Sequence, residues 1–289
     1  MPELPEVEVV RAGLAPAVTG ARIDHVEILD ARSLKRHDAR RGDFVGMLTG
    51  ARIDSVERRG KFMWLTLSTG DALVVHLGMS GQVLLREPGV DGDRHVRIRF
   101  DVTHPQHGDL VVAFVDQRIF GSMAVDALIE QHGALVPTQV AHIALDPLDE
   151  RFDDDAFVAA LRHKRTGIKR ALLDQTLVSG IGNIYADEAL WASRLHYDRP
   201  TDRVSAAQAR TVLAEARAVL RKALAEGGTS FDEQYVNVNG QAGYFAHSLN
   251  AYGRQGQACP RCGVPIVRES FMNRGSHFCP VCQRRPRGR

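Results

Sequence analysis

Hydrophobic positions divide the chain into a helical start, a strand-rich stretch and a longer helical stretch. Apolar residues recur at helical spacing after Pro5, a residue suited to the first turn of a helix, and predict a helix over residues 5–18. From about residue 20 to 125, runs rich in β-branched or aromatic residues alternate with Gly, Asp or Pro turns; the runs are 62–67, 73–77, 96–100 and 110–115. This stretch is therefore expected to form one β-sandwich or β-barrel domain.

The periodic pattern stops over residues 137–150 and is helical afterwards. Asn183 is expected to cap one helix, and Ser205 with Gln208 forms a capping-box pattern at the start of another. The predicted fold class is α+β. Its expected parts are a β-sheet domain with an N-terminal helix over 1–137, a hinge over 138–150, a helical domain over 151–250 and a C-terminal segment over 251–289.

The segment SGIGNIY, residues 179–185, joins two of the predicted helices in a tight, glycine-rich turn. Such a turn resembles a helix–turn–helix variant, in which glycines allow close backbone approach and a helix N-terminus offers N–H groups to phosphate. An ordinary αα-hairpin is the commoner explanation of the pattern. The motif alone therefore leaves nucleic-acid binding open.

All four cysteines lie in the last 31 residues, in two CxxC pairs separated by 16 residues; they are Cys259, Cys262, Cys279 and Cys282. Two CxxC turns at this spacing are typical of a four-thiolate zinc site, and four protein ligands leave no open position, so the metal is predicted to be structural. Iron in a rubredoxin-like site is the competing interpretation, because the same thiolates bind iron.

The chain around the cysteines is basic, whereas the net charge of the whole chain is only +2. Residues 254–289 contain eight arginines and one acid, which suits contact with phosphate. A solvated tail is the other interpretation, favoured for the last residues, RRPRGR. Between the CxxC pairs a β-hairpin is expected, with Ile266 and Val267 opposite Phe278 and with Arg274 near the tip or in the second strand.

Neither a membrane span nor a secretion signal is predicted. No run approaches the roughly 20 apolar residues of a membrane helix. The start, MPELPEVEVV, is acidic and has no basic region before an apolar stretch. The expectation is a cytoplasmic monomer without a membrane partner, and in that compartment clustered cysteines favour a metal over disulfides.

The N-terminus offers a candidate nucleophile. Removal of the initiator Met would expose the secondary amine of Pro2, and α-amines are partly neutral near pH 7. A neutral amine can attack an electrophilic carbon and form an iminium. Glu3 and Glu6 lie within one turn as candidate proton donor and acceptor. A solvated helix start is the commoner role of such a sequence, so these residues alone support only a hypothesis.

Several motifs stand together in one order along the chain. PELPEVE begins at Pro2, RRGKF contains Lys61, HLGMSGQ contains His76 and Met79, and DQRIFG contains Arg118. SGIGNIYADE, GGTSF, NGQAGYF and the two CxxC motifs complete the series. This combination resembles the bacterial formamidopyrimidine-DNA glycosylase family over almost the whole chain.

The resemblance implies an N-terminal β-sandwich, a helix–two-turn–helix domain and a zinc finger with one structural zinc ion. It also implies a base-excision repair enzyme that binds damaged double-stranded DNA and is nucleoid-associated when bound. Such an enzyme excises oxidised purines, 8-oxoguanine and formamidopyrimidines, and cuts the strand by β- and δ-elimination. The target nucleotide is flipped out, because its glycosidic carbon is unreachable inside the base stack.

Catalytic roles follow from the resemblance by position. Pro2 would attack C1′ of the sugar, Glu3 would donate the proton that opens the sugar ring, and Glu6 would help to position the site. Lys61 would contact phosphate and assist β-elimination. Arg274 would grip the phosphates that flank the lesion and is linked to δ-elimination.

DNA-binding roles follow in the same way. Met79, Arg118 and Phe120 would fill the gap left by the flipped base, and Arg118 would read the opposite cytosine. Asn183 would hold the DNA backbone from a helix N-terminus, and residues 229–245 would close over the flipped base. The remaining expected DNA contacts are His76, His95, Lys164, Lys169 and Tyr185.

Three features depart from the family pattern. Asp93 stands where many relatives have a His, Ile119 stands where many have a second Arg, and the loop QYVNVNGQAG has an unusual sequence. One phosphate contact and the lesion preference are therefore open.

Two other functions compete. The sister endonuclease VIII type shares the fold but prefers oxidised pyrimidines, and the triad Met79, Arg118 and Phe120 favours the purine branch. A non-enzymatic zinc DNA-binding protein would need no free N-terminal amine.

Overall fold

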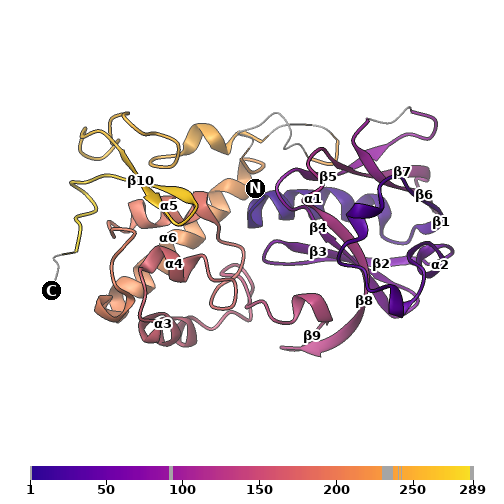
Figure 1. Cartoon of the computed structure of the whole chain (residues 1–289), viewed down its shortest axis with the longest axis horizontal. Coiled ribbons are helices and arrows are strands. Elements are labelled where there is room, and N and C mark those ends of the chain that lie inside the picture. The colour runs from indigo at the N-terminus through magenta and orange to yellow at the C-terminus, as the bar shows by residue number, and fades with distance from the viewer. Residues whose placement is uncertain (1, 91–93, 230–236, 240, 242, 287–289) are drawn as a thin grey trace. The chain divides into compact units, whose positions relative to one another are not determined.

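The computed structural model of the chain describes residues 2–90, 94–229, 237–239, 241 and 243–286. It divides into two compact units, one formed by residues 1–142 with 227–244 and the other by residues 143–226 with 245–289. Figure 1 labels their elements. Among the described residues, every helix is too short or too polar to cross a membrane.

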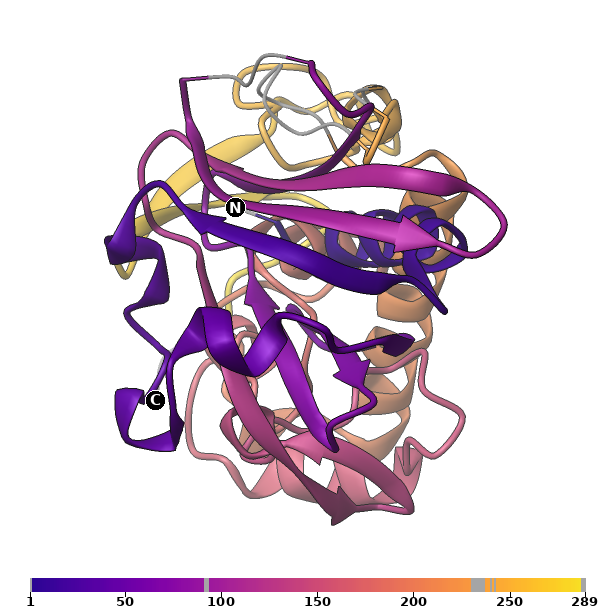
Figure 2. The same cartoon turned by 90° about the vertical axis from the view of Figure 1, so that its right-hand side faces the viewer.

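Two antiparallel sheets face each other in the first unit (Figures 1 and 2). One sheet has the order β1-β6-β7-β5, with bounds Arg22–Ile28, Val96–His104, Gly108–Asp116 and Gly81–Arg86. The other has the order β2-β3-β4-β8-β9, with bounds Ile53–Arg59, Phe62–Leu67, Asp71–His76, Ser122–Gln131 and Ala134–Pro137. Side chains of both sheets share one apolar core. The expected β-sandwich is confirmed, and the barrel alternative is wrong because the strands form two separate sheets.

Helix α1 (Leu4–Val18) begins one residue before the predicted start and packs against β2, β3 and β6. Its residues Val7 and Leu14 are buried in the sandwich core, together with residues of the short helix α2 (Phe44–Leu48). The apolar residues whose spacing predicts α1 therefore form the face that packs the helix against the sandwich. Short 3-10 helices occupy the connections at Ala31–Leu34, Ala39–Arg41 and Thr138–Val140.

The second unit is helical and ends in a two-stranded hairpin. Its helices are α3 (Asp154–His163), α4 (Ile168–Leu172), α5 (Asn183–Ala192) and α6 (Ala206–Ala225), with 3-10 turns at Thr201–Arg203 and Phe245–Ser248. The predicted capping box at the start of α6 is confirmed, because Ser205 and Gln208 exchange two hydrogen bonds of 3.1 Å. In the hairpin, β10 (Val267–Phe271) pairs with β11 (Arg274–Phe278), and Val267 lies opposite Phe278 as expected.

The predicted cap of α5 is wrong by one residue. Gly182 is the N-cap, and Asn183 is the first helical residue. The Asn183 side chain does not turn back onto its own helix; its amide Nδ2 donates to the carbonyl of Gly275 at 3.2 Å. A residue that usually caps a helix here fastens the hairpin to it.

Residues 227–244 group with the first unit, although they follow the helices of the second along the chain. Val238 is 1 % exposed and belongs to the sandwich core, and its carbonyl accepts a hydrogen bond of 3.0 Å from the Leu85 N–H. Chain order places this segment in the helical domain, but core packing and a main-chain hydrogen bond attach it to the sandwich.

Candidate functional site

The start of α1 carries two buried carboxylates beside Pro2. Glu3 is 2 % exposed and Glu6 is 8 % exposed. One carboxylate oxygen of Glu6 accepts the main-chain N–H of Glu3 at 2.8 Å, and the other accepts the N–H and hydroxyl of Thr229 at 2.8 and 2.6 Å. Glu6 therefore fixes both the backbone next to Pro2 and the point where the expected closing loop begins.

That second attachment depends on Gly228. Its φ is +82°, and a Cβ there would lie 3.2 Å from a carboxylate oxygen of Glu6. A glycine lets the chain adopt this conformation and approach the carboxylate closely. Of residues 229–245, positions 230–236, 240 and 242 lie outside the described residues, as does Asp93.

Lys61 and His76 lie at neighbouring strand ends of the five-stranded sheet. Lys61 precedes β3, and His76 ends β4 opposite Phe62, with the two rings 4.6 Å apart. Burial lowers the pKa of His76 to about 4, helped by the positive charges of Arg36, Lys35 and Lys61. His76 is therefore neutral at pH 7, with one ring N–H to offer a ligand.

Two adjacent loops present the expected wedge residues. Met79, between β4 and β5, is 39 % exposed, and Phe120, between β7 and β8, is 46 % exposed. Arg118 is also exposed. The loops touch, because a Cβ on Gly78 would lie 2.4 Å from the carbonyl carbon of Phe120. The contact between the two loops therefore holds two exposed apolar side chains on one part of the surface.

His95 lies just before β6, beside the same loops. Its carbonyl accepts the N–H of Asp116, the last residue of β7, at 2.9 Å. The Nε of Arg94 donates to its ring at 3.1 Å, and Arg97 lies 3.4 Å from the other ring nitrogen. The structure thus places His95 between two arginines, just before the inner strand β6 of the four-stranded sheet.

In the second unit, a hydrogen bond from Asn183 to the residue after Arg274 brings these two predicted DNA contacts close together. Gly275, the residue after Arg274, accepts the Asn183 side-chain amide at 3.2 Å. Arg274 is exposed at the start of β11, next to the turn residue Met272, whose φ is +53°. The expectation that Arg274 lies near the tip of the hairpin is confirmed.

The structure places Lys169 away from the surface, contrary to its predicted contact with DNA. Its side chain is 0 % exposed and forms an ion pair of 2.7 Å with Asp187, which is 1 % exposed. Its ammonium also donates to Ser276 Oγ at 3.0 Å and to the carbonyl of Gly275 at 3.2 Å. A buried ammonium held by these groups cannot reach a phosphate; it joins α4 and α5 to the hairpin that carries Arg274.

Two other expected DNA contacts have protein partners. The Tyr185 side chain is 0 % exposed and its ring lies 5.7 Å from that of Phe245, so this side chain, contrary to prediction, offers no surface to DNA. Lys164 is partly exposed and forms an ion pair with Asp174. Lys164 can contact a phosphate only in competition with that carboxylate.

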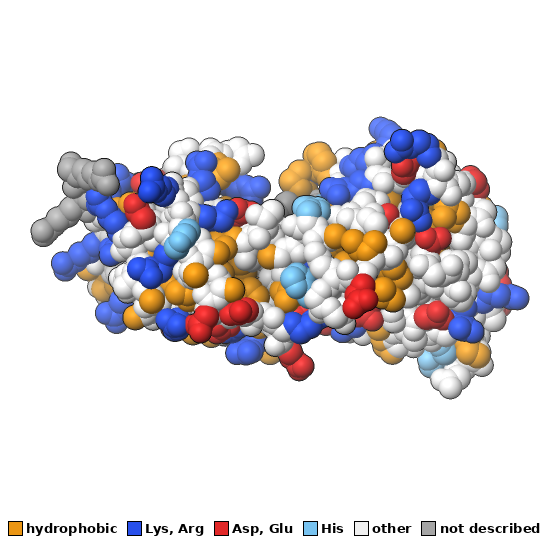
Figure 3. Space-filling model, turned by 90° about the horizontal axis from the view of Figure 1, so that it is seen from below, with side chains coloured by type: hydrophobic (Ala, Val, Ile, Leu, Met, Phe, Trp, Pro, Cys, Tyr) orange, Lys and Arg blue, Asp and Glu red, His pale blue; other side chains and the backbone are white. Residues whose placement is uncertain are grey.

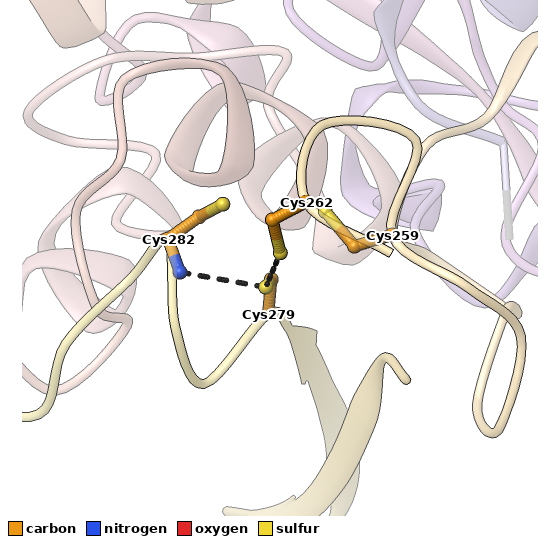
Figure 4. A group of neighbouring side chains, drawn as sticks. All are labelled: Cys259, Cys262, Cys279 and Cys282. Carbon is orange, nitrogen blue, oxygen red and sulfur yellow. Dashed lines mark hydrogen bonds between the residues drawn. The ribbon is translucent and has the colours of Figure 1, made fainter. Parts of the chain in front are cut away.

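The four cysteines converge at the end of the hairpin (Figure 4). Their sulfur atoms all lie within 4.8 Å of one another. A tetrahedral zinc with bonds of about 2.3 Å separates its sulfur ligands by about 3.8 Å, so the four thiolates fit this ion. The Trp191 indole donates to Cys259 Sγ at 3.4 Å, and the Cys282 N–H donates to Cys279 Sγ at 3.4 Å. Such donors orient and stabilise metal-bound thiolates.

The pKa values of two of the thiols are shifted in opposite directions. Burial raises the pKa of Cys279 to about 12. Burial acts in the same direction on Cys259, but N–H donors from the Trp191 side chain and from the backbone outweigh it and lower the pKa of Cys259 to about 6. Four neighbouring thiolates repel one another, and a divalent cation between them allows all four to ionise.

One face of the molecule carries charges of both signs. On the face drawn in Figure 3, Lys and Arg side chains alternate with Asp and Glu rather than forming one unbroken basic band. This agrees with the small net charge of +2. Affinity for an anionic partner must therefore come from particular cations rather than from the overall field.

Comparison with known proteins covers nearly the whole chain. Residues 1–123 match the formamidopyrimidine-DNA glycosylase N-terminal domain, residues 143–234 match the H2TH domain of the same enzymes, and residues 256–285 match the zinc finger found in FPG and IleRS. The chain is 63% identical to the formamidopyrimidine-DNA glycosylase of Leifsonia xyli subsp. xyli, covering 98% of this chain and 100% of the relative.

The chain belongs to the formamidopyrimidine-DNA glycosylase family. Two solved structures of the Lactococcus lactis FPG, each 30% identical, cover 98% of this chain and 100% of theirs. One is a complex with an abasic-site-containing DNA and the other with a Fapy-dG-containing DNA, and their TM-scores are 0.84 and 0.83.

Membership of this glycosylase family assigns the general chemistry. The chain is a DNA glycosylase and AP lyase of base excision repair, and its four-cysteine site holds one structural zinc ion. A regulator without catalytic activity, one of the competing functions, is thereby excluded.

Removal of zinc from this glycosylase is expected to unfold the hairpin and leave the β-sandwich folded. The finger has only a small core around Cys259 and Cys279, whereas the sandwich has a large one. Elemental analysis should find one zinc per chain, and chelation should change Trp191 fluorescence while the far-ultraviolet signal of the sandwich persists. Stoichiometric iron with visible thiolate absorbance would instead support the rubredoxin-like alternative.

Arg274 and Lys169 are expected to respond differently to substitution. Arg274→Ala should reduce the slope of log binding constant against log salt by about 0.9, the value for one phosphate contact. Lys169→Met should lower the free energy of unfolding by about 3–5 kcal/mol, because Asp187 loses its buried partner. It should reduce the slope by no more than Arg274→Ala does, because the buried Lys169 can act on the slope only by displacing Arg274.

Arg210→Ala is the matched surface control, since Arg210 on α6 pairs with Asp155; it should change neither quantity. Salt titrations and urea unfolding measure the two effects. A slope that falls further in folded Lys169→Met than in Arg274→Ala would contradict the buried position of Lys169.

The neutral state of His76 predicts a pH dependence of stability. Its folded pKa of about 4 lies below the unfolded value of 6.5. The unfolded chain therefore binds more protons between these values, and the contribution, about 3 kcal/mol, is complete above pH 6.5 and lost as pH falls through 4. Urea unfolding across this range should show the loss, and His76→Gln should remove it. His142→Gln, at an exposed position, is the control; an NMR titration midpoint for His76 near 6.5 would refute the assignment.

Proposed function

We propose that the chain excises oxidised purines, 8-oxoguanine and formamidopyrimidines, from duplex DNA through an iminium on Pro2, and then cuts the strand by β- and δ-elimination. The observation that carries this proposal is the buried pair Glu3 and Glu6 at the start of α1. Their hydrogen bonds fix the backbone beside Pro2. Binding of Fapy-dG and abasic-site DNA by the Lactococcus lactis relative supports the substrate class.

The first chemical steps use the N-terminus once Met1 is removed. The neutral Pro2 amine attacks C1′, the glycosidic bond breaks, and the base leaves with the electron pair and takes up a proton. The Pro2 nitrogen then loses its proton. Glu3 donates a proton to O4′ as the C1′–O4′ bond breaks, and the nitrogen lone pair completes the iminium. Glu6 acts by position, since its two oxygens hold Glu3 and Thr229.

The strand is cut from the iminium. The positive nitrogen acidifies the C2′ hydrogen, whose removal expels the 3′ phosphate; a second elimination expels the 5′ phosphate. Lys61 assists the first elimination and contacts phosphate. Arg274 grips the phosphates flanking the lesion and assists the second, supported by its exposed position on a hairpin fixed by the Lys169–Asp187 ion pair.

Extrusion of the target nucleotide leaves a gap in the base stack. Met79 and Phe120 would fill it with apolar surface, and Arg118 would donate hydrogen bonds to the opposite cytosine. His76, His95, Asn183 and Lys164 would contact the DNA backbone. Residues 229–245 would close over the flipped base, and residues 138–150 would act as a hinge between the domains at 1–137 and 151–250.

Borohydride trapping tests the nucleophile. Reduction of the iminium joins protein to a lesion-containing duplex, and peptide mapping should place the linkage on Pro2. An N-terminal extension, which makes the Pro2 nitrogen an amide, should abolish the adduct, and Pro2→Gly should reduce it at least about tenfold. Mass spectrometry must first show that Met1 is removed.

Pro16→Ala is the matched control, because Pro16 lies exposed within the same helix and leaves the Pro2 amine intact; it should trap normally. Equal trapping by the extended protein would refute the role of Pro2. Rates on 8-oxoguanine opposite cytosine and on thymine glycol separate the purine and pyrimidine branches, and faster pyrimidine excision would overturn the substrate assignment.

A further inference from the structure

Asp116 is a buried acid for which the proposed chemistry has no role. It ends β7 and is 0 % exposed. One of its carboxylate oxygens accepts the Gly121 N–H at 2.7 Å. The other accepts the Ser80 hydroxyl at 2.5 Å and the Arg118 N–H at 3.2 Å. A single carboxylate therefore joins the loop before β5 to both ends of the loop after β7.

The two loops are also packed backbone to backbone. Gly78 has a φ of +64°, and a Cβ there would lie 2.4–2.6 Å from main-chain atoms of Phe120 and Gly121. A Cβ on Gly121 would lie 2.8 Å from the carbonyl oxygen of His76 and 3.0 Å from Asp116 Oδ2. Only glycines allow this approach, so the carboxylate lies where the loops are closest.

The loop after β7 is held in an unfavourable conformation. Ile119 has a φ of +56°, which is rare for a β-branched residue and costs on the order of a few kcal/mol when imposed by the surroundings. Lys35 donates to the carbonyls of Ile119 and Phe120 at 2.9 and 3.1 Å. Hydrogen bonds to Asp116 on one side and from Lys35 on the other keep this loop in place.

A carboxylate suits this position better than a neutral side chain. Both of its oxygens accept, so it satisfies three donors that point at it, and bonds to an ionised acceptor are stronger than neutral ones. An amide would present an N–H₂ group to at least one of those donors. Of the functional side chains nearby, Met79, Arg118 and Phe120 all lie within two residues of a group that bonds Asp116 or packs beside it.

We propose that Asp116 is a positioning residue that holds the Met79 turn and the loop of residues 118–120 as one rigid wedge for the duplex. Because the two loops are locked together, Arg118 meets the base opposite the lesion at a fixed distance from the apolar side chains that fill the gap. This inference rests on the wedge role in the proposed function. It adds that discrimination of the opposite base depends on a buried carboxylate that does not itself touch DNA.

Asp116→Asn tests the proposal, with Asp126→Asn as its matched control. Asp126 is a buried acid of β8 in the same unit, 4 % exposed, and accepts the Gln139 N–H at 2.8 Å and the Thr138 hydroxyl at 2.7 Å. Both variants lose one ionised acceptor in the sandwich, but only Asp116 bonds the wedge loops. The experiment uses the whole, zinc-loaded chain, and thermal unfolding is measured first to establish that each variant is folded.

The expected effect is selective. Asp116→Asn should slow excision of 8-oxoguanine opposite cytosine by about tenfold or more, the scale of loss when a positioned group is displaced. The rate ratio between cytosine and adenine opposite the lesion should fall towards one. Cleavage at a preformed abasic site, where no base must be evicted, should change by less than about threefold. Asp126→Asn, at a position that bonds Thr138 and Gln139 rather than the wedge loops, should leave the cytosine-to-adenine ratio at the wild-type value.

A double-mutant cycle separates positioning from a general loss of stability. If Asp116 acts through the wedge, Asp116→Asn should add little to the loss already caused by Arg118→Ala. Additive losses in the cycle, or an unchanged cytosine-to-adenine ratio in Asp116→Asn, would overturn the proposal.

Two readouts without chemistry test the wedge separately from the enzyme activity. Amide exchange at Arg118 and Gly121 should speed up in Asp116→Asn and not in Asp126→Asn. A 2-aminopurine beside a tetrahydrofuran site should report weaker unstacking on binding. If the wild-type protein excises no oxidised purine, the proposed substrate is wrong, but these two readouts still test the wedge. If the readouts are unchanged in Asp116→Asn, the inference about Asp116 is wrong whatever the enzyme activity.

Discussion

A loop that presents side chains to a ligand is held only in part by the hydrophobic core, because its backbone runs along the surface and most of its side chains point outward. In this protein, buried carboxylates that accept main-chain N–H groups supply the missing anchor. Glu6 holds Glu3 and Thr229, Asp116 holds Arg118 and Gly121. Each acid is buried, so water does not compete for its hydrogen bonds and the attached backbone stays in one conformation.

The same interaction organises the second unit. Asp187 accepts the His277 N–H at 2.9 Å and pairs with Lys169 at 2.7 Å, which fixes the hairpin against α4 and α5. Burial of two charges costs desolvation, and a core of apolar residues could give similar stability. The hairpin is too short to build such a core. Zinc at one end and the ion pair at the other therefore define the position of the hairpin. Arg274 belongs to the hairpin, so its position is fixed in the same way.

Regular elements were predictable where the sequence repeats a burial pattern. The run 62–67 coincides with β3, and the predicted first helix differs from α1 by one residue. Strands β1 and β2 were missed because their sequences, RIDHVEI and IDSVERR, carry charges at the exposed positions and few apolar residues between them. The hairpin was predictable for another reason: cysteine spacing constrains the chain independently of hydrophobicity.

Site residues were predictable by chemical type but not by burial. Lys169 and Arg274 both read as cations for phosphate, yet one is buried and the other exposed. The difference depends on Asp187, which lies 18 residues after Lys169 along the chain. The two side chains meet only because α4 packs against α5. The spacing of residues along the chain therefore could not predict this ion pair.

The roles of the acids near these loops could not be predicted from the sequence either. Sequence position makes Glu3 and Glu6 equal candidates for proton transfer, but Glu6 spends both oxygens on the Glu3 N–H and on Thr229. A carboxylate with both oxygens engaged in this way is suited to hold geometry. In the motif DQRIFG, the sequence gives no sign of what the aspartate does. Its hydrogen bonds to the Arg118 and Gly121 N–H groups show that Asp116 holds the loop that carries Arg118 and Phe120. Roles of acids around such a site therefore follow from what their oxygens accept rather than from their distance to the nucleophile.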